Sequence, residues 1–202
     1  MKKRVDLPEK KYEGYIFDLD GTLVDSMPLH YKAWRKALAC AGAPNDVFLA
    51  DEFYSCGGKS ANDVVRFLNE KYGMQMDATS TAENKRRIYL EMLAEEGMRP
   101  IQEVVDFVLS LGDAPKAIAT GSALPGASQT LAASGLSGLF KVILTPDDVQ
   151  HGKPAPDMFL KAAEVLGVNP SRCVVFEDAE PGMKAAAAAG MDCVQVRRAA
   201  LD

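Results

Sequence analysis

From about residue 101 to the end of the chain, two kinds of segment alternate. Some have an apolar residue every three or four positions, which is typical of helices, and others are short continuous apolar runs, which are typical of buried strands. The predicted helices cover 101–111, 124–134, 157–166 and 183–189, and the predicted strands cover 116–119, 142–144, 173–176 and 192–196. This alternation predicts an α/β fold, a doubly wound parallel sheet with helices on both faces.

Residues 27–100 break the alternation. Helical periodicity covers 29–41, 62–72 and 81–95, with no convincing strand between these segments. We therefore predict an α-helical cap, residues 27–100, inserted into a core formed by residues 1–26 and 101–202. Inserted after the first strand, the cap would lie over the carboxyl ends of the strands, where open α/β sheets bind their ligands.

The first strand is the apolar run Tyr15-Ile16-Phe17, and two carboxylates and an Asp20-Gly21 turn follow it. Because side chains alternate along a strand, we expect Asp18 and Asp20 on the same face. Two neighbouring acids can serve as nucleophile and general acid or base if a cation or nearby dipoles offset their charge. The alternative is an Asp-Gly turn with a capping acid, which these residues alone leave open.

Composition and charge narrow the class of partner. With 202 residues, the chain can form one domain with an insertion or two small domains, and 48% hydrophobic with 25% charged residues is typical of a globular protein. A net charge of −5 and the lack of a basic stripe argue against nucleic acid. A small phosphorylated ligand would need only local positive charge. We expect the protein to be a monomer or a weak homodimer.

The cellular location is predicted from the absence of a membrane-spanning segment and of a signal peptide in the sequence. No run approaches the roughly 18 apolar residues of a membrane span, and no signal-peptide pattern follows the basic residues 1–11. We therefore expect no membrane partner and a cytoplasmic location. The cysteines have no Cys-x-x-Cys spacing and are expected to be buried free thiols: Cys40, Cys56, Cys173 and Cys193.

Polar groups also follow the later strands. These groups are Thr120-Gly121-Ser122, Lys153 and Glu177-Asp178. Since the carboxyl ends of parallel strands meet at one edge of a sheet, we expect them to converge on Asp18 and Asp20. Each has a structural alternative, because a lysine can be solvated and the other two motifs can cap the helices that follow them.

These motifs, in this order, resemble those of the haloacid dehalogenase superfamily. Its motifs are Asp-x-Asp-Gly-Thr, a strand-end Ser or Thr, a Lys and a carboxylate pair, here Asp18–Thr22, Thr120, Lys153 and Glu177-Asp178. The match spans nearly the whole chain and implies a Rossmann-like core with an α-helical cap. The cap resembles that of the β-phosphoglucomutase-like branch. Segments 151–158, 173–179 and 189–192 look most like bacterial fructose-1-phosphate phosphatase-type proteins.

The resemblance implies roles for the motif residues. Asp18 would be the nucleophile that forms an aspartyl-phosphate, and Asp20 would protonate the leaving alcohol and then activate water. Mg²⁺ would bind the Asp18 carboxylate, the Asp20 carbonyl and Asp178, with Glu177 either a ligand or a neighbour of the ligands. The groups that would hold the phosphoryl oxygens are Thr120, Gly121, Ser122 and Lys153.

The cap would decide the substrate. Lys59, in the loop Gly57-Gly58-Lys59-Ser60, and His30 are candidate substrate contacts, while Trp34 is expected in the core. Lys85 and Arg86 are expected on a solvated helical face. The predicted function is phosphatase action on a small phosphorylated metabolite, most simply a sugar phosphate.

Two alternatives stay open. A β-phosphoglucomutase-like mutase is one, although its cap loop carries an arginine where this loop has Lys59. The other is a non-catalytic phosphoryl-binding protein, which retention of all four motifs argues against.

Overall fold

A five-stranded parallel sheet forms the centre of the computed structural model, which describes residues 4–57 and 59–198. The strand order is β3-β2-β1-β4-β5. The strands are β1 (Gly14–Phe17), β2 (Lys116–Ala119), β3 (Ile143–Leu144), β4 (Cys173–Glu177) and β5 (Asp192–Gln195). The predicted strands are confirmed with small differences at their ends.

Helices make up most of the remaining described chain. They are α1 (Met27–Cys40), α2 (Ala50–Ser55), α3 (Ala61–Tyr72), α4 (Ala78–Glu96), α5 (Gln102–Ser110), α6 (Leu124–Ala133), α7 (Asp157–Leu166) and α8 (Glu180–Ala188), with short 3-10 helices at Pro146–Asp148 and Pro170–Arg172. Among the described residues, no helix combines the length and apolar character that a membrane crossing needs.

Helices cover both faces of the sheet, as predicted. Phe17 and Phe176 pack towards α5 and α6, whereas Ile16 and Val175 pack towards α7 and α8. This division follows from the alternation of side chains along β1 and β4, both of which are buried on their two faces. The chain adds β2 and β3 on one side of β1 and then β4 and β5 on the other, so β1 marks the switch point at which such sheets bind ligands.

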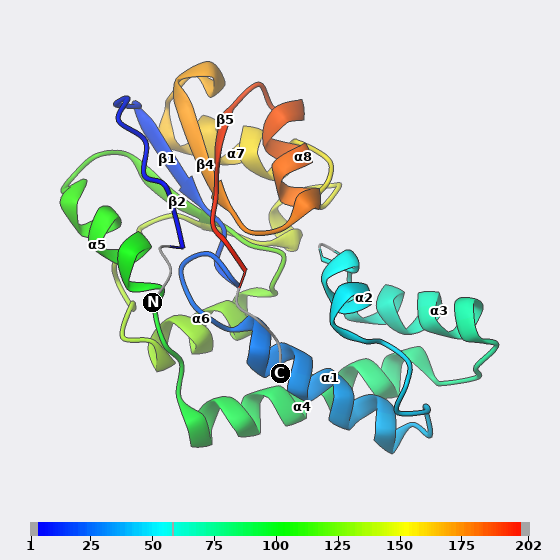
Figure 1. The fold of residues 1–202 in the computed structure, drawn as a ribbon. Helices are drawn as coiled ribbons and strands as arrows, with labels where there is room; N and C mark the ends of the chain where they lie inside the picture. The colour runs from blue at the N-terminus through cyan, green and yellow to red at the C-terminus, as the bar shows by residue number, and fades with distance from the viewer. Residues whose placement is uncertain (1–3, 58, 199–202) are drawn as a thin grey trace.

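Helices α1 to α4 form the cap between β1 and α5 (Figure 1). Helix α1 is apolar on two sides: Leu29 and Ala33 join the core cluster that includes Ile88 of α4, while Trp34 and Leu38 join a separate cap cluster. One cap face therefore packs continuously with the core. The α-helical cap is confirmed, and the domain boundaries at residues 27 and 100 stay predictions.

Three expectations need correction. Helix α2 was not predicted, because with only Phe53 buried its six residues show no helical periodicity. Helix α8 begins at Glu180 rather than Met183, since Pro and Gly interrupt the apolar pattern although proline is tolerated in a first helical turn. Cys40 and Cys193 are exposed rather than buried, the latter on the edge strand β5, and all four thiols are free.

Candidate active site

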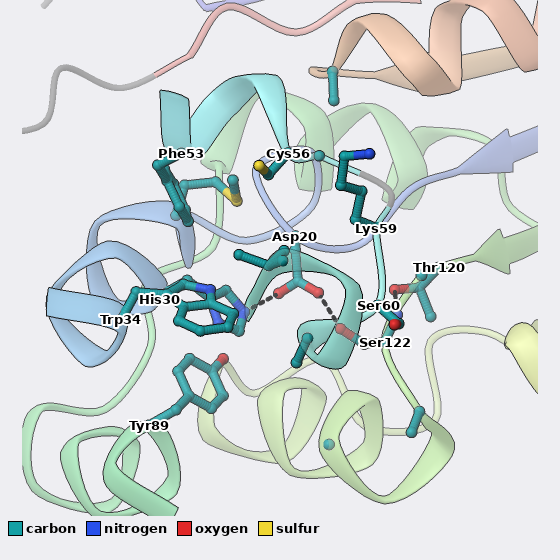
Figure 2. A pocket seen from close by; sticks show the side chains of 18 of the residues that line it. Asp20, His30, Trp34, Phe53, Cys56, Lys59, Ser60, Tyr89, Thr120 and Ser122 are labelled. Carbon is teal, nitrogen blue, oxygen red and sulfur yellow. Dashed lines mark hydrogen bonds and ion pairs between the residues drawn. The ribbon is translucent and has the colours of Figure 1, made fainter. Parts of the chain in front are cut away.

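The polar groups at the strand ends converge, as the sequence predicts. Asp18 follows β1, Thr120 follows β2, and Glu177 and Asp178 lie at the end of β4. All four residues, with Lys153, line one cavity of about 480 Å³. Helices α1 and α4 of the cap contribute other lining residues, so the cavity lies between cap and core (Figure 2).

Lys153 is a buried cation between two carboxylates. Its Nζ lies 2.6 Å from Asp18 Oδ1 and 2.6 Å from Glu177 Oε1, and its side chain is 6% exposed. Burial disfavours the ammonium, but the charges of Asp18 and Glu177 outweigh it and raise the lysine pKa above its ordinary value. The alternative of a solvated surface lysine is therefore wrong.

Three carboxylates crowd together at this point. Oxygen atoms of Asp18, Glu177 and Asp178 all lie within 4.8 Å of one another. Burial and the charge of Glu177 raise the pKa of Asp178 to about 7, and burial likewise raises the pKa of Asp18 although Lys153 opposes it. Asp178 Oδ2 is buried without a hydrogen-bond partner, which is a costly state for a carboxylate and an open position for a cation.

Glu177 differs from its two neighbours because both of its oxygens have partners. Oε1 accepts from Lys153, and Oε2 accepts the backbone N–H of Ala179 at 2.8 Å. Ala179 directly precedes α8, so the predicted alternative of a carboxylate at a helix start is partly correct for Glu177. Glu177 is thus placed to orient Lys153 and the loop that carries Asp178.

Asp20 lies in a separate hydrogen-bond network at the cavity (Figure 2). Oδ1 accepts from Ser26 Oγ at 2.6 Å and from His30 Nε2 at 3.3 Å, and Oδ2 accepts from Ser122 Oγ at 2.7 Å. Burial raises the pKa of Asp20, but the hydrogen bonds from His30 and from the two serine hydroxyls lower it below its ordinary value. These donors favour the ionised carboxylate.

His30 links Asp20 to Lys85 of α4. The Lys85 ammonium lies 2.8 Å from His30 Nδ1, while the imidazole stacks on Tyr89 with ring centroids 4.0 Å apart. Burial and the neighbouring Lys85 charge lower the pKa of His30, so the ring is neutral and its two nitrogens can accept from Lys85 and donate to Asp20. His30 therefore contacts Asp20 of the core and also lines the cavity.

The expectation that Lys85 belongs to a solvated face is wrong. Its ammonium lies 5.6 Å from the Trp34 ring centroid and 5.1 Å from that of Tyr89, and the side chain lines the cavity. Burial lowers the pKa of Lys85 to about 8, although Asp20 raises it. Arg86 is exposed as predicted, but it also lines the cavity.

Residues 120–122 line the cavity and do not cap the next helix. The Ser122 N–H donates to Thr120 Oγ1 at 3.0 Å, and Ala123 caps α6 without a side-chain hydrogen bond. The helix-capping alternative for residues 120–122 is therefore wrong. Thr120 is buried, whereas Gly121 is exposed and lines the cavity.

The cap loop lines the same cavity, except that Gly58 lies outside the described residues. Lys59 is exposed, and its ammonium lies 5.8 Å from the ring centroid of Phe67. Trp34 is 5% exposed in the cap cluster, as predicted, and also contributes to the cavity wall.

Sequence reasoning missed several residues of this site. Ser26 and Tyr89 lie in helical or loop segments whose pattern signals packing, and only the fold brings them to Asp20 and His30. Gly182 is the missed residue that a signal could have found, because a glycine in the first turn of a helix indicates a close approach. A Cβ atom at Gly182 would lie 1.8 Å from Glu177 Oε1.

Gly182→Ala tests this close approach. We expect the methyl group to displace Glu177, break its ion pair with Lys153, lower the stability by about 1–3 kcal/mol and reduce activity. Gly126→Ala, also in a helix but with nothing within 4 Å of its Cβ position, should be neutral or stabilising. Thermal unfolding of both variants measures the difference, and equal stability would contradict the packing described.

Residues 12–190 match the family of haloacid dehalogenase-like hydrolases, and the chain belongs to this family. It is an enzyme, a phosphatase that hydrolyses phosphate monoesters. The fructose-1-phosphate phosphatase YqaB of Escherichia coli K12 is 39% identical to it over 189 residues, which cover 93% of this chain and 98% of that relative.

Solved structures have the same fold as this chain. CbbY from Rhodobacter sphaeroides, determined in complex with phosphate, superposes with a TM-score of 0.76 at 26% identity, over 90% of this chain and 84% of that one. A β-phosphoglucomutase from Clostridium difficile superposes with a TM-score of 0.73 at 28% identity, over 90% and 83% of the two chains.

Proposed function

We propose that this enzyme is a Mg²⁺-dependent phosphatase of a small sugar phosphate and acts through an aspartyl-phosphate on Asp18. The observation that carries the proposal is the position of Asp18, at the end of β1, in contact with Lys153 and beside Asp178 in a cavity that the cap completes. The name of the YqaB relative supports a ketose phosphate as substrate.

The acidic cluster fits a divalent cation. Three carboxylates against one ammonium leave a formal charge of −2 when all are ionised, and Asp178 Oδ2 has no partner within the described protein. Carboxylate and carbonyl oxygens are the ligands that Mg²⁺ prefers. Asp18, Asp178 and the Asp20 carbonyl would hold the ion. Glu177 would not be a ligand, because both of its oxygens already have partners, and it would instead orient Lys153 and the loop of Asp178. Bound Mg²⁺ would offset the charge of the phosphoryl group and the acids.

The residues of the chain divide the chemistry. The Asp18 carboxylate attacks phosphorus and forms the aspartyl-phosphate, while the alcohol leaves. Lys153, the Thr120 hydroxyl and the Gly121 amide hold the phosphoryl oxygens, where negative charge is greatest in the transition state.

Asp20 acts in both half-reactions. The donors on Ser26, His30 and Ser122 favour its ionised form, which activates water to attack the aspartyl-phosphate. Asp20 donates a proton to the leaving alcohol in the first step and regains a proton from the attacking water in the second, so its protonation state is restored after each turnover.

Trapping the covalent intermediate tests the mechanism. Acid quench of a single turnover with a sugar phosphate should leave a phosphoryl group on the peptide that contains Asp18, as detected by mass spectrometry. Phosphate release without any labelled Asp18 at early times would contradict the covalent route and favour direct attack by water.

A mutase remains the second candidate. The cap loop lacks an arginine, but Arg86 of α4 lines the cavity, and its planar guanidinium can make bidentate hydrogen bonds to a phosphate group. The structural similarity to a β-phosphoglucomutase is compatible with a mutase.

A cytoplasmic location and a monomeric or weakly dimeric state are also proposed, from the sequence alone.

Lys59→Ala tests the cap loop as a substrate contact. Since Lys59 is exposed at the cavity, we expect kcat/KM for a sugar phosphate to fall about tenfold, with little change for a generic aryl phosphate that does not use the cap. Steady-state kinetics of the two substrates measure this. Equal small losses of kcat/KM for both substrates would show that Lys59 is solvated and does not contact the substrate.

Lys85 predicts a pH dependence. Its pKa of about 8 means that its charge, and any contact with a substrate oxygen, is present below pH 8 and is lost as the pH rises through 8. We expect kcat/KM for a sugar phosphate to fall by about tenfold per pH unit above this value. The neighbouring Asp20 and Lys153 keep their charges there, because their pKa values lie below and above this range.

The matched control is Lys85→Arg, whose guanidinium does not titrate in this range. Its profile should stay flat above pH 8. The same fall in both proteins, or in wild-type turnover of an aryl phosphate, would show that another group titrates.

A further inference from the structure

Residues 196–198, the C-terminal arm, are fixed beside the end of β4. The Val196 N–H donates to the carbonyl of Glu177 at 2.8 Å, and the Arg197 N–H donates to the carbonyl of Arg4 at 2.7 Å. The arm is thus hydrogen-bonded on one side to the active-site strand and on the other to the N-terminal segment. This anchorage determines where the next side chain, Arg198, can reach.

Arg198 contacts both the core and the cap. Its Nε donates to the backbone carbonyl of Asp178 at 3.1 Å, and its guanidinium carbon lies 4.4 Å from the ring centroid of Tyr54 in α2. A guanidinium at this distance from an aromatic ring gains a cation–π interaction and can still hydrogen-bond through its edge. One side chain therefore joins the loop of Asp178 to a cap helix.

A second contact lies at the same place. A Cβ atom at Gly57, two residues beyond α2, would lie 3.4 Å from the Cβ of Ala179 and 3.3 Å from the Tyr54 carbonyl. The backbone after α2 thus packs on the residue that follows Asp178. Both Gly57 and Ala179 line the cavity, so this cap–core contact borders the site itself.

We propose that Arg198 is a positioning residue that couples the α2 end of the cap to the Asp178 loop. When the cap is in place, Tyr54 orients the guanidinium, and the guanidinium fixes the Asp178 carbonyl and hence the direction of its carboxylate. By reciprocity, an ordered Asp178 loop stabilises the cap in the same position. The coupling is a property of the fold; only its effect on a metal rests on the proposed function.

Hydrogen–deuterium exchange of the metal-free protein tests the coupling. Arg198→Ala and Tyr54→Leu should each speed amide exchange about two- to fivefold in both α2 and residues 177–180, the range expected for loss of an exposed cation–π contact. The informative variant is Tyr54→Leu, because the substitution lies in the cap and its effect is measured as amide exchange in core residues 177–180. Tyr54→Phe keeps the ring and hence the cation–π contact, so its exchange should stay closer to wild type than that of Tyr54→Leu.

Arg197→Ala is the matched control, because Arg197 is the neighbouring arginine of the arm and its guanidinium pairs with Asp6 at 2.5 Å. It should leave exchange in α2 and residues 177–180 unchanged. The proposal is overturned if Tyr54→Leu affects α2 alone, or if Arg197→Ala has the same effect as Arg198→Ala.

Calorimetry with Mg²⁺ alone gives a second readout. Arg198→Ala and Tyr54→Leu should weaken Mg²⁺ binding by about the same two- to fivefold factor, and Arg197→Ala should not. Unchanged affinity in Tyr54→Leu would overturn the claim that the cap orients Asp178. If the wild-type protein binds no Mg²⁺, the proposed cofactor is wrong, and the exchange experiment alone decides the coupling.

Discussion

Asp18→Asn is expected to abolish turnover while the protein stays folded. The amide fills the same volume but cannot attack phosphorus, so the rate of phosphate release should fall by roughly 10⁴-fold or more, the range seen when a nucleophile is removed. The fold should persist because the substitution removes one of three crowded carboxylates and Lys153 keeps its ion pair with Glu177.

Activity and thermal unfolding of the same preparation separate the two effects. Ser171→Ala, at a site remote from the cavity lining, serves as a control for handling and should retain wild-type activity. A folded Asp18→Asn protein that kept a substantial fraction of the wild-type rate would exclude Asp18 as the nucleophile.

Removal of divalent metal is expected to have an effect of similar size. Without a cation, Asp18, Glu177 and Asp178 present negative charge to a dianionic substrate, and the Lys153 ammonium offsets that charge only in part. Chelator should therefore abolish phosphate release, and added Mg²⁺ should restore it. Ca²⁺ should inhibit, because its larger and looser ligand shell misplaces the nucleophile.

Asp178→Asn identifies the site of the metal effect. We expect saturation with Mg²⁺ to require a concentration roughly 100-fold higher, since loss of a ligand should cost at least as much as loss of its supporting partners. An unchanged Mg²⁺ requirement in this variant would place the ion elsewhere. Full activity in chelator would contradict the role of the metal altogether.

The sheet and the strand-end site could be predicted because their signals are local. Continuous apolar runs mark β1, β2 and β4, and each is followed at once by its polar group, so spacing along the chain predicts proximity in space. The family motifs strengthened this prediction because their order matched the order of the strands. The buried position of Lys153 also followed from convergence, although its loop reads locally as solvent-exposed.

The cap side of the site could not be predicted in the same way. Lys85 lies 55 positions from His30, in a helix rich in charged residues, and only the packing of α1 against α4 brings the two together. Helical periodicity predicts that a residue faces a neighbour but not which neighbour. Arg198 is a stronger case, since its contacts with Asp178 and Tyr54 depend on how the C-terminal arm is anchored.

A product assay on a panel of phosphorylated sugars, fructose 1-phosphate included, tests the central claim most directly. Purified protein with Mg²⁺ should release inorganic phosphate from at least one sugar phosphate with a kcat/KM above that for an aryl phosphate, and chelator should stop the reaction. Conversion of the sugar phosphate to an isomer without phosphate release would instead identify a mutase. No turnover of any member of the panel, in a protein that hydrolyses aryl phosphates, would contradict a sugar phosphate as the substrate.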